Sequence, residues 1–140
     1  MRQGQGNRIE DRLRRFFKGL GGFHHAIDFE TSTTCYEVKS CNLFNRCYNA
    51  NHKRKFKDKP HKRIATFQHG RFNVIMHNHF EIAELAQQKG KSAKYIFVIA
   101  VENQIIWRII PWSKVNELLK SHIRGQDMDW VYLSISEVFY

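Results

Sequence analysis

The chain has little of several features that would assign it to a specialised class. It contains only three cysteines, Cys35, Cys41 and Cys47, and no CxxC pair typical of zinc or redox chemistry. No apolar run reaches the roughly 18 residues that span a bilayer, and the charged N-terminus is unlike a secretory signal. No glycine-rich nucleotide loop is present. We therefore expect a soluble, intracellular protein, cytoplasmic or nucleoid-associated, with reduced thiols and no small-molecule cofactor.

Acidic side chains are also scarce. The 140 residues include 23 Lys and Arg but only 13 Asp and Glu, which gives a net charge of +10. Such an excess of positive charge is typical of a protein that binds a polyanion. Hydrophobic residues make up 42% of the chain and aromatic residues 14%, enough to build one core. These values predict a single domain over residues 1–140 that binds a polyanion.

The charges are unevenly distributed along the chain. Residues 1–19 carry six basic and two acidic side chains, whereas residues 20–45 have a net charge of −2. A strongly basic segment follows, and its candidate DNA-binding residues are Arg46, Lys53, Arg54, Lys55, Lys57, Lys59, Lys62 and Arg63. Carboxylates hold divalent cations, while Lys and Arg hold neighbouring phosphates. An acidic segment between two basic ones therefore suits metal-assisted cleavage of a phosphodiester.

Hydrophobic periodicity in the first half predicts a helix followed by strands. Apolar residues from Ile9 to Leu20 recur at helical spacing, with Asn7 as the expected N-cap and Gly21-Gly22 as the stop. Residues 23–29 and 34–40 alternate as two strands joined by a polar turn at 31–33. The polar, basic segment at about 42–63 predicts a long loop or insertion.

The second half predicts further strands and helices. Residues 64–76 suggest a hairpin that turns at His69-Gly70, followed by a helix that Gly90 closes. Residues 95–101 form an apolar run typical of a buried central strand, and residues 105–110 follow it. A helix opened by Pro111 and Ser113 and a last strand at 131–135 complete the order. The expected class is α/β, a mixed central sheet with helices on its faces.

The acidic segment contains an acid followed nine positions later by Glu-x-Lys, namely Asp28, Glu37 and Lys39. Side chains alternate along a strand, so Glu37 and Lys39 project together while Tyr36 and Val38 point into the core. This pattern resembles the PD-(D/E)XK nucleases, which include restriction enzymes and archaeal Holliday-junction resolvases. The resemblance implies a restriction endonuclease-like core and a homodimer.

The resemblance also implies a metal-dependent chemistry. Asp28 and Glu37 would hold Mg²⁺, or Mn²⁺ as a substitute, with the Val38 carbonyl as an additional ligand. The metal would lower the pKa of a water and neutralise the scissile phosphate, while Lys39 would orient that water. Resolvase-like members carry a Glu in the preceding helix, and Glu10 has the corresponding place. Glu10 is equally well explained as a capping-box partner of Asn7.

Two departures from the family are visible. Ile27 replaces the proline that precedes the first acid, and the basic segment exceeds the compact resolvase pattern. His24, His25 and Glu30 either join the site or only border it. A zinc site from Cys35, Cys41, Cys47 and His52 lacks the usual paired spacing, and the His77-Asn78-His79 tripeptide is not an HNH nuclease motif.

The function predicted from the sequence is a Mg²⁺-dependent DNA endonuclease. Its target is open between a recognised sequence, as in restriction enzymes, and a recognised structure, as in resolvases. Two other classes remain open. One is a nucleic-acid-binding module without catalysis, whose binding would weaken steeply with salt but which would not cut. The other is an RNA-processing nuclease.

Overall fold

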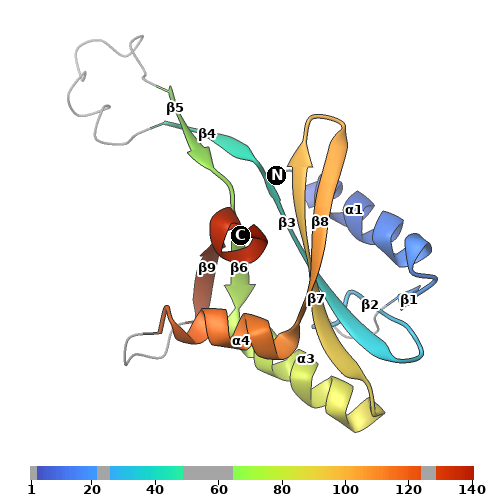
Figure 1. Ribbon diagram of the computed structural model, residues 1–140. Helices are drawn as coiled ribbons and strands as arrows, with labels where there is room; N and C mark the ends of the chain where they lie inside the picture. Colours follow the sequence, from blue (N-terminus) through green and yellow to red (C-terminus); the bar gives the residue numbers. More distant parts are fainter. Residues whose placement is uncertain (1–2, 22–25, 49–64, 124–128) are drawn as a thin grey trace.

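The protein has a mixed α/β fold, seen in a computed structural model that describes residues 3–21, 26–48, 65–123 and 129–140 (Figure 1). Its elements in chain order are α1 (Gln3–Phe16), β1 (Leu20–Gly21), β2 (Phe29–Glu30), β3 (Thr34–Asn42), β4 (Phe44–Tyr48), β5 (Ala65–His69), β6 (Arg71–Ile75), α3 (Met76–Lys89), β7 (Ser92–Val101), β8 (Gln104–Pro111), α4 (Trp112–Lys120), β9 (Trp130–Ser134) and α5 (Ile135–Phe139). A central mixed sheet flanked by helices confirms the predicted class. No helix in the described ranges is long and apolar enough to cross a membrane.

The central sheet has five strands in the order β1-β2-β3-β7-β8. Strands β3 and β7 run parallel, and their register places Glu37 beside Tyr95. The other neighbours are antiparallel. Strand β7 is buried from Tyr95 to Ala100 and is flanked by a strand on each side, as its apolar run predicts. Nine consecutive pairings with the buried strand β7 therefore fix the position of β3, which carries the candidate site.

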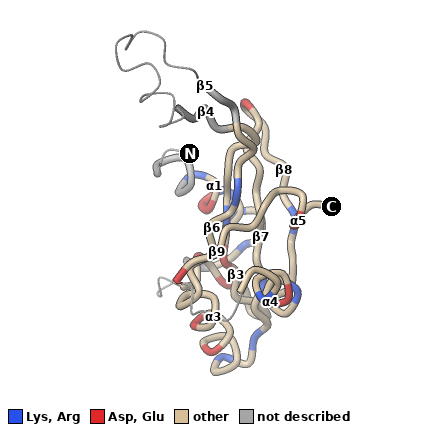
Figure 2. Tube along the Cα trace, turned by 90° about the vertical axis from the view of Figure 1, so that its left-hand side faces the viewer, with Lys and Arg blue, Asp and Glu red and all other residues tan. Residues whose placement is uncertain are grey.

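Strand β3 sends alternate side chains to opposite faces of the sheet. Tyr36 and Val38 pack against Ile9 and Leu13, which form the apolar stripe of α1. Figure 1 shows α1 to the right of β3, β7 and β8 and both α4 and α5 to the left, and Figure 2 views the molecule from this left-hand side. The predicted inward direction of Tyr36 and Val38 is confirmed, because both side chains are buried under the helix.

The opposite face of β3 carries Glu37, Lys39 and Cys41, which share one parity along the strand. Cys41 belongs to the main hydrophobic cluster together with Phe72 and Val74 of β6. The same cluster includes side chains from β7, α4, β9 and α5. The candidate catalytic side chains therefore lie on the side of the sheet that β6 and β9 cover.

Gly70 separates two strands that do not pair with each other, so the predicted hairpin over 64–76 is wrong. β5 pairs with β4, and β6 pairs with β9. A side chain at Gly70 would collide with the backbone carbonyl of Asn42, while the Gly70 amide donates to the Leu43 carbonyl at 3.0 Å. The turn is thus pressed against the end of β3, and the two strands leave it in different directions.

The predicted loop at about 42–63 also needs correction. Its first part is strand β4, paired residue by residue with β5. β4 and β5 form a two-stranded ribbon separate from the central sheet. The strand was missed because residues 44–48 show no regular alternation of apolar and polar residues. Residues 49–64 lie outside the described part of the chain.

Helix α1 begins at Gln3 rather than after Asn7, so the predicted N-cap is wrong. It ends at Phe16, before the predicted stop at Gly21-Gly22. Lys18 adopts a left-handed φ of 54°, and the Gly19 amide donates to the Arg14 carbonyl at 2.8 Å. Such a left-handed residue closes a helix by satisfying its last carbonyls, and here a lysine takes the role usually held by glycine.

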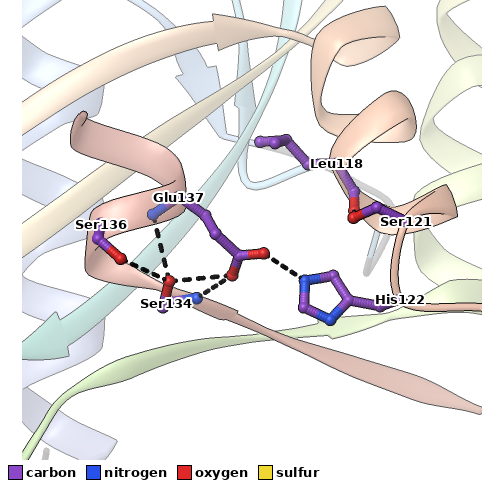
Figure 3. A network of polar contacts seen from close by, with 6 residues as sticks. All are labelled: Leu118, Ser121, His122, Ser134, Ser136 and Glu137. Atoms are coloured by element: carbon purple, nitrogen blue, oxygen red, sulfur yellow. Dashed lines mark hydrogen bonds and ion pairs between the residues drawn. The ribbon is translucent and has the colours of Figure 1, made fainter.

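The later helices follow their sequence signals more closely. Gly90 closes α3 with a φ of 67°, and its amide donates to carbonyls of the last turn. The predicted last strand stops at Ser134 instead of continuing through Ile135. Ser134 and Glu137 form a reciprocal capping box that starts the short helix α5, as drawn in Figure 3. That helix is absent from the sequence prediction.

Candidate active site

Asp28 and Glu37 face each other across the β2–β3 pairing. The Asp28 amide donates to the Tyr36 carbonyl at 2.9 Å, immediately beside the paired residues Phe29 and Tyr36. The Val38 amide in turn donates to Asp28 Oδ2 at 2.6 Å. These two bonds extend the antiparallel ladder by one step, and the second one is made to a side chain. The backbone of β3 thus holds the first acid of the motif against the Glu-x-Lys strand.

Glu37 is a buried carboxylate with an incomplete set of partners. Only 8% of the residue is exposed. Its Oε1 lies 3.2 Å from Lys39 Nζ, whereas the buried Oε2 has no partner in hydrogen-bond geometry. Burial, followed by the charge of Asp28, raises the pKa of Glu37 to about 8, although Lys39 opposes the shift. An oxygen left without a partner in a buried position is costly unless a ligand meets it.

Asp28 shares the same environment. Burial raises the pKa of Asp28, while the hydrogen bond from the Val38 amide and the charge of Lys39 oppose the shift. The charge of Asp28 also raises the pKa of Glu37, so the two carboxyl groups are electrostatic neighbours. Two carboxylates in one low-dielectric site repel each other, and either a proton or a cation relieves this repulsion.

Glu10 reaches the same group of charges from α1. Burial first, and then the charges of Asp28 and Asp11, raise the pKa of Glu10 to about 7, while Lys39 lowers it. Glu10 also contributes to the raised pKa of Glu37. The capping-box alternative for Glu10 is wrong, because Asn7 lies inside α1 and cannot be its N-cap. The helical glutamate is thus an electrostatic neighbour of the motif on β2 and β3.

The acids are neighbours without forming a closed ligand cage. Within the described ranges, no group of three or more His, Cys, Asp or Glu side chains has an arrangement that could hold a metal ion. The Val38 backbone adds to the donor set at one edge. Its amide points to Asp28, and in a strand the carbonyl of the same residue points to the same side. The Val38 carbonyl predicted as a ligand therefore faces the edge occupied by Asp28.

Tyr95 and His79 border the site and were not predicted as part of it. Tyr95 lies beside Glu37 in the β3–β7 register, and burial followed by the charge of Glu37 raises the pKa of its phenol. The phenol lies 2.6 Å from His79 Nδ1, while His79 Nε2 lies 3.1 Å from Asn116 Oδ1. Trp112 stacks on the imidazole and donates to the His79 carbonyl. The one signal in the sequence was a tyrosine at the start of the apolar run 95–101.

Glu30, left open as a site residue, is used elsewhere. It forms ion pairs with Lys89 at 3.0 Å and Lys91 at 3.5 Å, which lie at and just after the end of α3. These lysines lower the pKa of Glu30. Although Glu30 and Asp28 share a strand parity, the lysines fix Glu30 as an ordinary paired carboxylate at the border of the site.

The remaining candidates are placed in part. Cys35 and Cys41 are buried free thiols, whereas His24, His25 and His52 lie outside the described residues. Among the candidate DNA-binding residues, Arg46 lies in β4 opposite Phe67. The other seven, Lys53, Arg54, Lys55, Lys57, Lys59, Lys62 and Arg63, fall in the undescribed segment 49–64.

Comparison with known proteins adds no family assignment. No protein-family model, no curated protein and no solved structure matches the chain. The resemblance to the PD-(D/E)XK nucleases therefore rests on Asp28, Glu37, Lys39 and Glu10 and on the order of elements that carries them.

Proposed function

We propose that the protein is a Mg²⁺-dependent DNA endonuclease with a restriction endonuclease-like core, whose active site is built from Asp28, Glu37, Lys39 and Glu10. The observation that carries the proposal is the buried Glu37 carboxylate, with one oxygen paired to Lys39 and the other without a partner. A buried carboxylate in this state costs stability, because its desolvation is only partly offset by Lys39, and such perturbed groups are typical of functional sites.

The donor set fits a hard divalent cation. The side chains of Asp28 and Glu37 offer carboxylate oxygens, and the Val38 carbonyl faces the same edge. Glu10 interacts electrostatically with both acids. Mg²⁺ prefers such oxygen ligands and keeps several waters, so a partial protein cage is sufficient, and Mn²⁺ is a plausible substitute. When bound, the ion would supply positive charge against the phosphate and acidify a nearby water.

The chain's own residues have distinct tasks in this scheme. The Val38 amide fixes Asp28 Oδ2 and thereby orients the first carboxylate. Lys39 neutralises Glu37 and retains partial exposure, so its ammonium is available to a phosphate oxygen or an attacking water. The ammonium would stabilise the charge that develops as the phosphodiester bond to the 3′ oxygen breaks and the 5′ phosphate forms.

The positive charge of the chain supports a polyanionic substrate. A net charge of +10 raises the local concentration of DNA and provides phosphate contacts outside the acidic site. We infer from the family resemblance that the enzyme acts as a homodimer, so that two sites address two strands. Comparing the cleavage of a plasmid with that of a four-way junction distinguishes sequence-specific from structure-specific cleavage.

Cleavage assays on two substrates test the proposal. Wild type, Glu37→Ala and the control Glu30→Ala are incubated with supercoiled plasmid and with a four-way junction, each in Mg²⁺ or in EDTA. We expect metal-dependent cutting by wild type and by the control. Loss of Glu37 should slow cutting by at least about 100-fold, since changes to residues that merely support a metal ligand already cost 10–100-fold. Glu30 is a matched control because it lies in the same hairpin but pairs with Lys89 and Lys91.

The outcomes separate the alternatives. Cutting by Glu37→Ala at the wild-type rate would show that the site is wrong. DNA binding that weakens with salt, with no metal-dependent cutting by wild type, would identify a non-catalytic binding module. Faster cleavage of a structured RNA than of either DNA would identify an RNA-processing nuclease.

A further inference from the structure

The ribbon formed by β6 and β9 has two chemically different faces. The antiparallel register pairs Arg71 with Ser134, Asn73 with Tyr132 and Ile75 with Trp130. The residues between them are Phe72 and Val74 on β6 and Val131 and Leu133 on β9, which are 0–2% exposed and belong to the main hydrophobic cluster. The face turned away from the core therefore consists of Arg71, Asn73, Ile75, Trp130, Tyr132 and Ser134.

The outer face of this ribbon is unusually aromatic for a surface. Trp130 is 52% exposed, Tyr132 42% and Ile75 43%. A strand face of this kind normally carries polar residues when only water meets it, because each exposed ring forfeits the free energy of burial. The side chains do not complete the core, since the core-facing positions of both strands are already occupied by buried residues.

One cation lies over an aromatic ring on this face. The Arg71 guanidinium carbon lies 4.2 Å from the centroid of the Tyr132 ring. Arg71 is the only formal charge among the six residues, so the face is positive as well as aromatic. Planar guanidinium groups and aromatic rings are the side chains on which unpaired bases stack, while the cation meets the phosphate backbone.

The ribbon lies on the same side of the sheet as the candidate active site. Its inner face packs with Cys41, which shares strand parity with Glu37 and Lys39 on β3. Figure 1 shows β6 and β9 side by side next to β3. A nucleic acid strand bound to the outer face of the ribbon would thus lie on the same side of the central sheet as the acids.

We propose that the outer face of the β6–β9 ribbon binds unpaired DNA bases, with Trp130 and Tyr132 as stacking surfaces and Arg71 as the phosphate contact. The proposal rests on the proposed function for the identity of the polymer as DNA. It deepens that function, because a stacking face selects a substrate with unstacked bases, such as a branched or frayed DNA, over continuous duplex.

Binding of oligothymidylate in EDTA tests the proposal without any cleavage. The full chain is titrated with a single-stranded 12-mer and with a duplex of the same length, by fluorescence anisotropy of the labelled DNA and by tryptophan quenching. Single-strand binding that is tighter than duplex binding supports the proposal. Trp130→Ala should weaken single-strand binding roughly tenfold or more, the usual effect of removing one stacking ring. Trp130→Phe should retain most of the affinity and lose most of the quenching.

Trp107→Ala is the matched control. Trp107 is 37% exposed on β8, where its ring contacts Phe16 and Phe17 edge-on. The substitution Trp107→Ala should leave the affinity for single-stranded DNA unchanged. Circular dichroism and the unfolding midpoint establish that each variant is folded. Because the assay contains no metal, its result is independent of whether the protein cuts DNA.

Three results would overturn the proposal. The first is equal loss of affinity in Trp130→Ala and Trp107→Ala. The second is tighter binding of oligouridylate than of oligothymidylate, which would reassign the polymer to RNA. The third is a change of oligomeric state in Trp130→Ala with unchanged DNA affinity, which would make the face a contact between copies of the chain.

Discussion

Glu37 and Glu137 are two glutamates in opposite electrostatic situations. Burial raises the pKa of Glu37, and one of its oxygens has no partner. Glu137 accepts hydrogen bonds from the amide and hydroxyl of Ser134 and from His122 (Figure 3), and these partners lower its pKa although burial opposes them. Both of its oxygens are used.

The difference between the two residues separates a carboxylate that supports the fold from one suited to a ligand. Glu137 starts a helix, stabilises its first turn and docks it against the chain that follows α4. Glu37 on β3 makes no comparable set of hydrogen bonds to the rest of the fold. Its environment favours a proton, or a cation from solution, over an isolated negative charge.

Exchanging each glutamate for glutamine should produce the largest contrast. We expect Glu37→Gln to lose at least about 100-fold in metal-dependent cleavage while its free energy of unfolding in EDTA equals or exceeds that of wild type, because the amide keeps the shape and removes a charge that is costly to bury. Glu137→Gln should do the reverse, keeping the cleavage rate and losing about 1 kcal/mol of stability, since its charge-assisted bonds become neutral ones. Urea unfolding and plasmid cleavage measure both. A cleavage defect in Glu137→Gln equal to that in Glu37→Gln would erase the distinction.

The pH dependence of stability should sharpen the comparison. The folded-state pKa values of Glu10 and Glu37, about 7 and about 8, exceed the ordinary value of 4.5. Below the ordinary value both states are protonated. As pH rises toward 8, the unfolded chain releases these protons first, so the metal-free protein loses stability. We expect the free energy of unfolding in EDTA to fall between pH 5 and pH 8 less steeply in Glu37→Gln than in wild type.

Other groups also titrate in this pH range, so the free energy of unfolding of Glu37→Gln is subtracted from that of wild type at each pH. Burial lowers the pKa of His79, and a lowered histidine pKa costs stability as pH falls below about 6.5. Glu137 and Glu30, with lowered pKa values, cost stability only at more acidic pH. The difference between wild type and Glu37→Gln at each pH isolates the buried acid. Parallel curves for the two proteins would contradict the assigned environment.

The smallest effect is expected at Glu30. Its ion pairs with Lys89 and Lys91 involve partly exposed side chains, and such pairs are typically worth at most about 1 kcal/mol. Glu30→Gln should therefore cost a few tenths to about 1 kcal/mol in urea unfolding, with a cleavage rate equal to that of wild type. A large loss of cleavage in Glu30→Gln would show that Glu30 takes part in the active site.

Local sequence signals predicted the elements whose ends are set by local chemistry. Gly90 was predicted to close α3, and its left-handed backbone does so. Alternation along β3 predicted that Tyr36 and Val38 point into the core. The predicted pairing of β5 with β6 was wrong because the sequences of two strands around a turn look alike whether or not the strands pair. Only the contact of Gly70 with the end of β3 separates them.

Sequence alone determined the charge excess, the Asp28 and Glu-x-Lys spacing and the α/β class, since each depends on residue type and on short-range periodicity. Tertiary structure decided which acids become neighbours, that Glu37 is buried with an oxygen lacking a partner, and that Trp130 and Tyr132 face outward. These properties depend on strand register and on which surfaces pack together. The pairing of β3 with β7 and of β6 with β9 links residues far apart in the chain, and no local pattern specifies that choice.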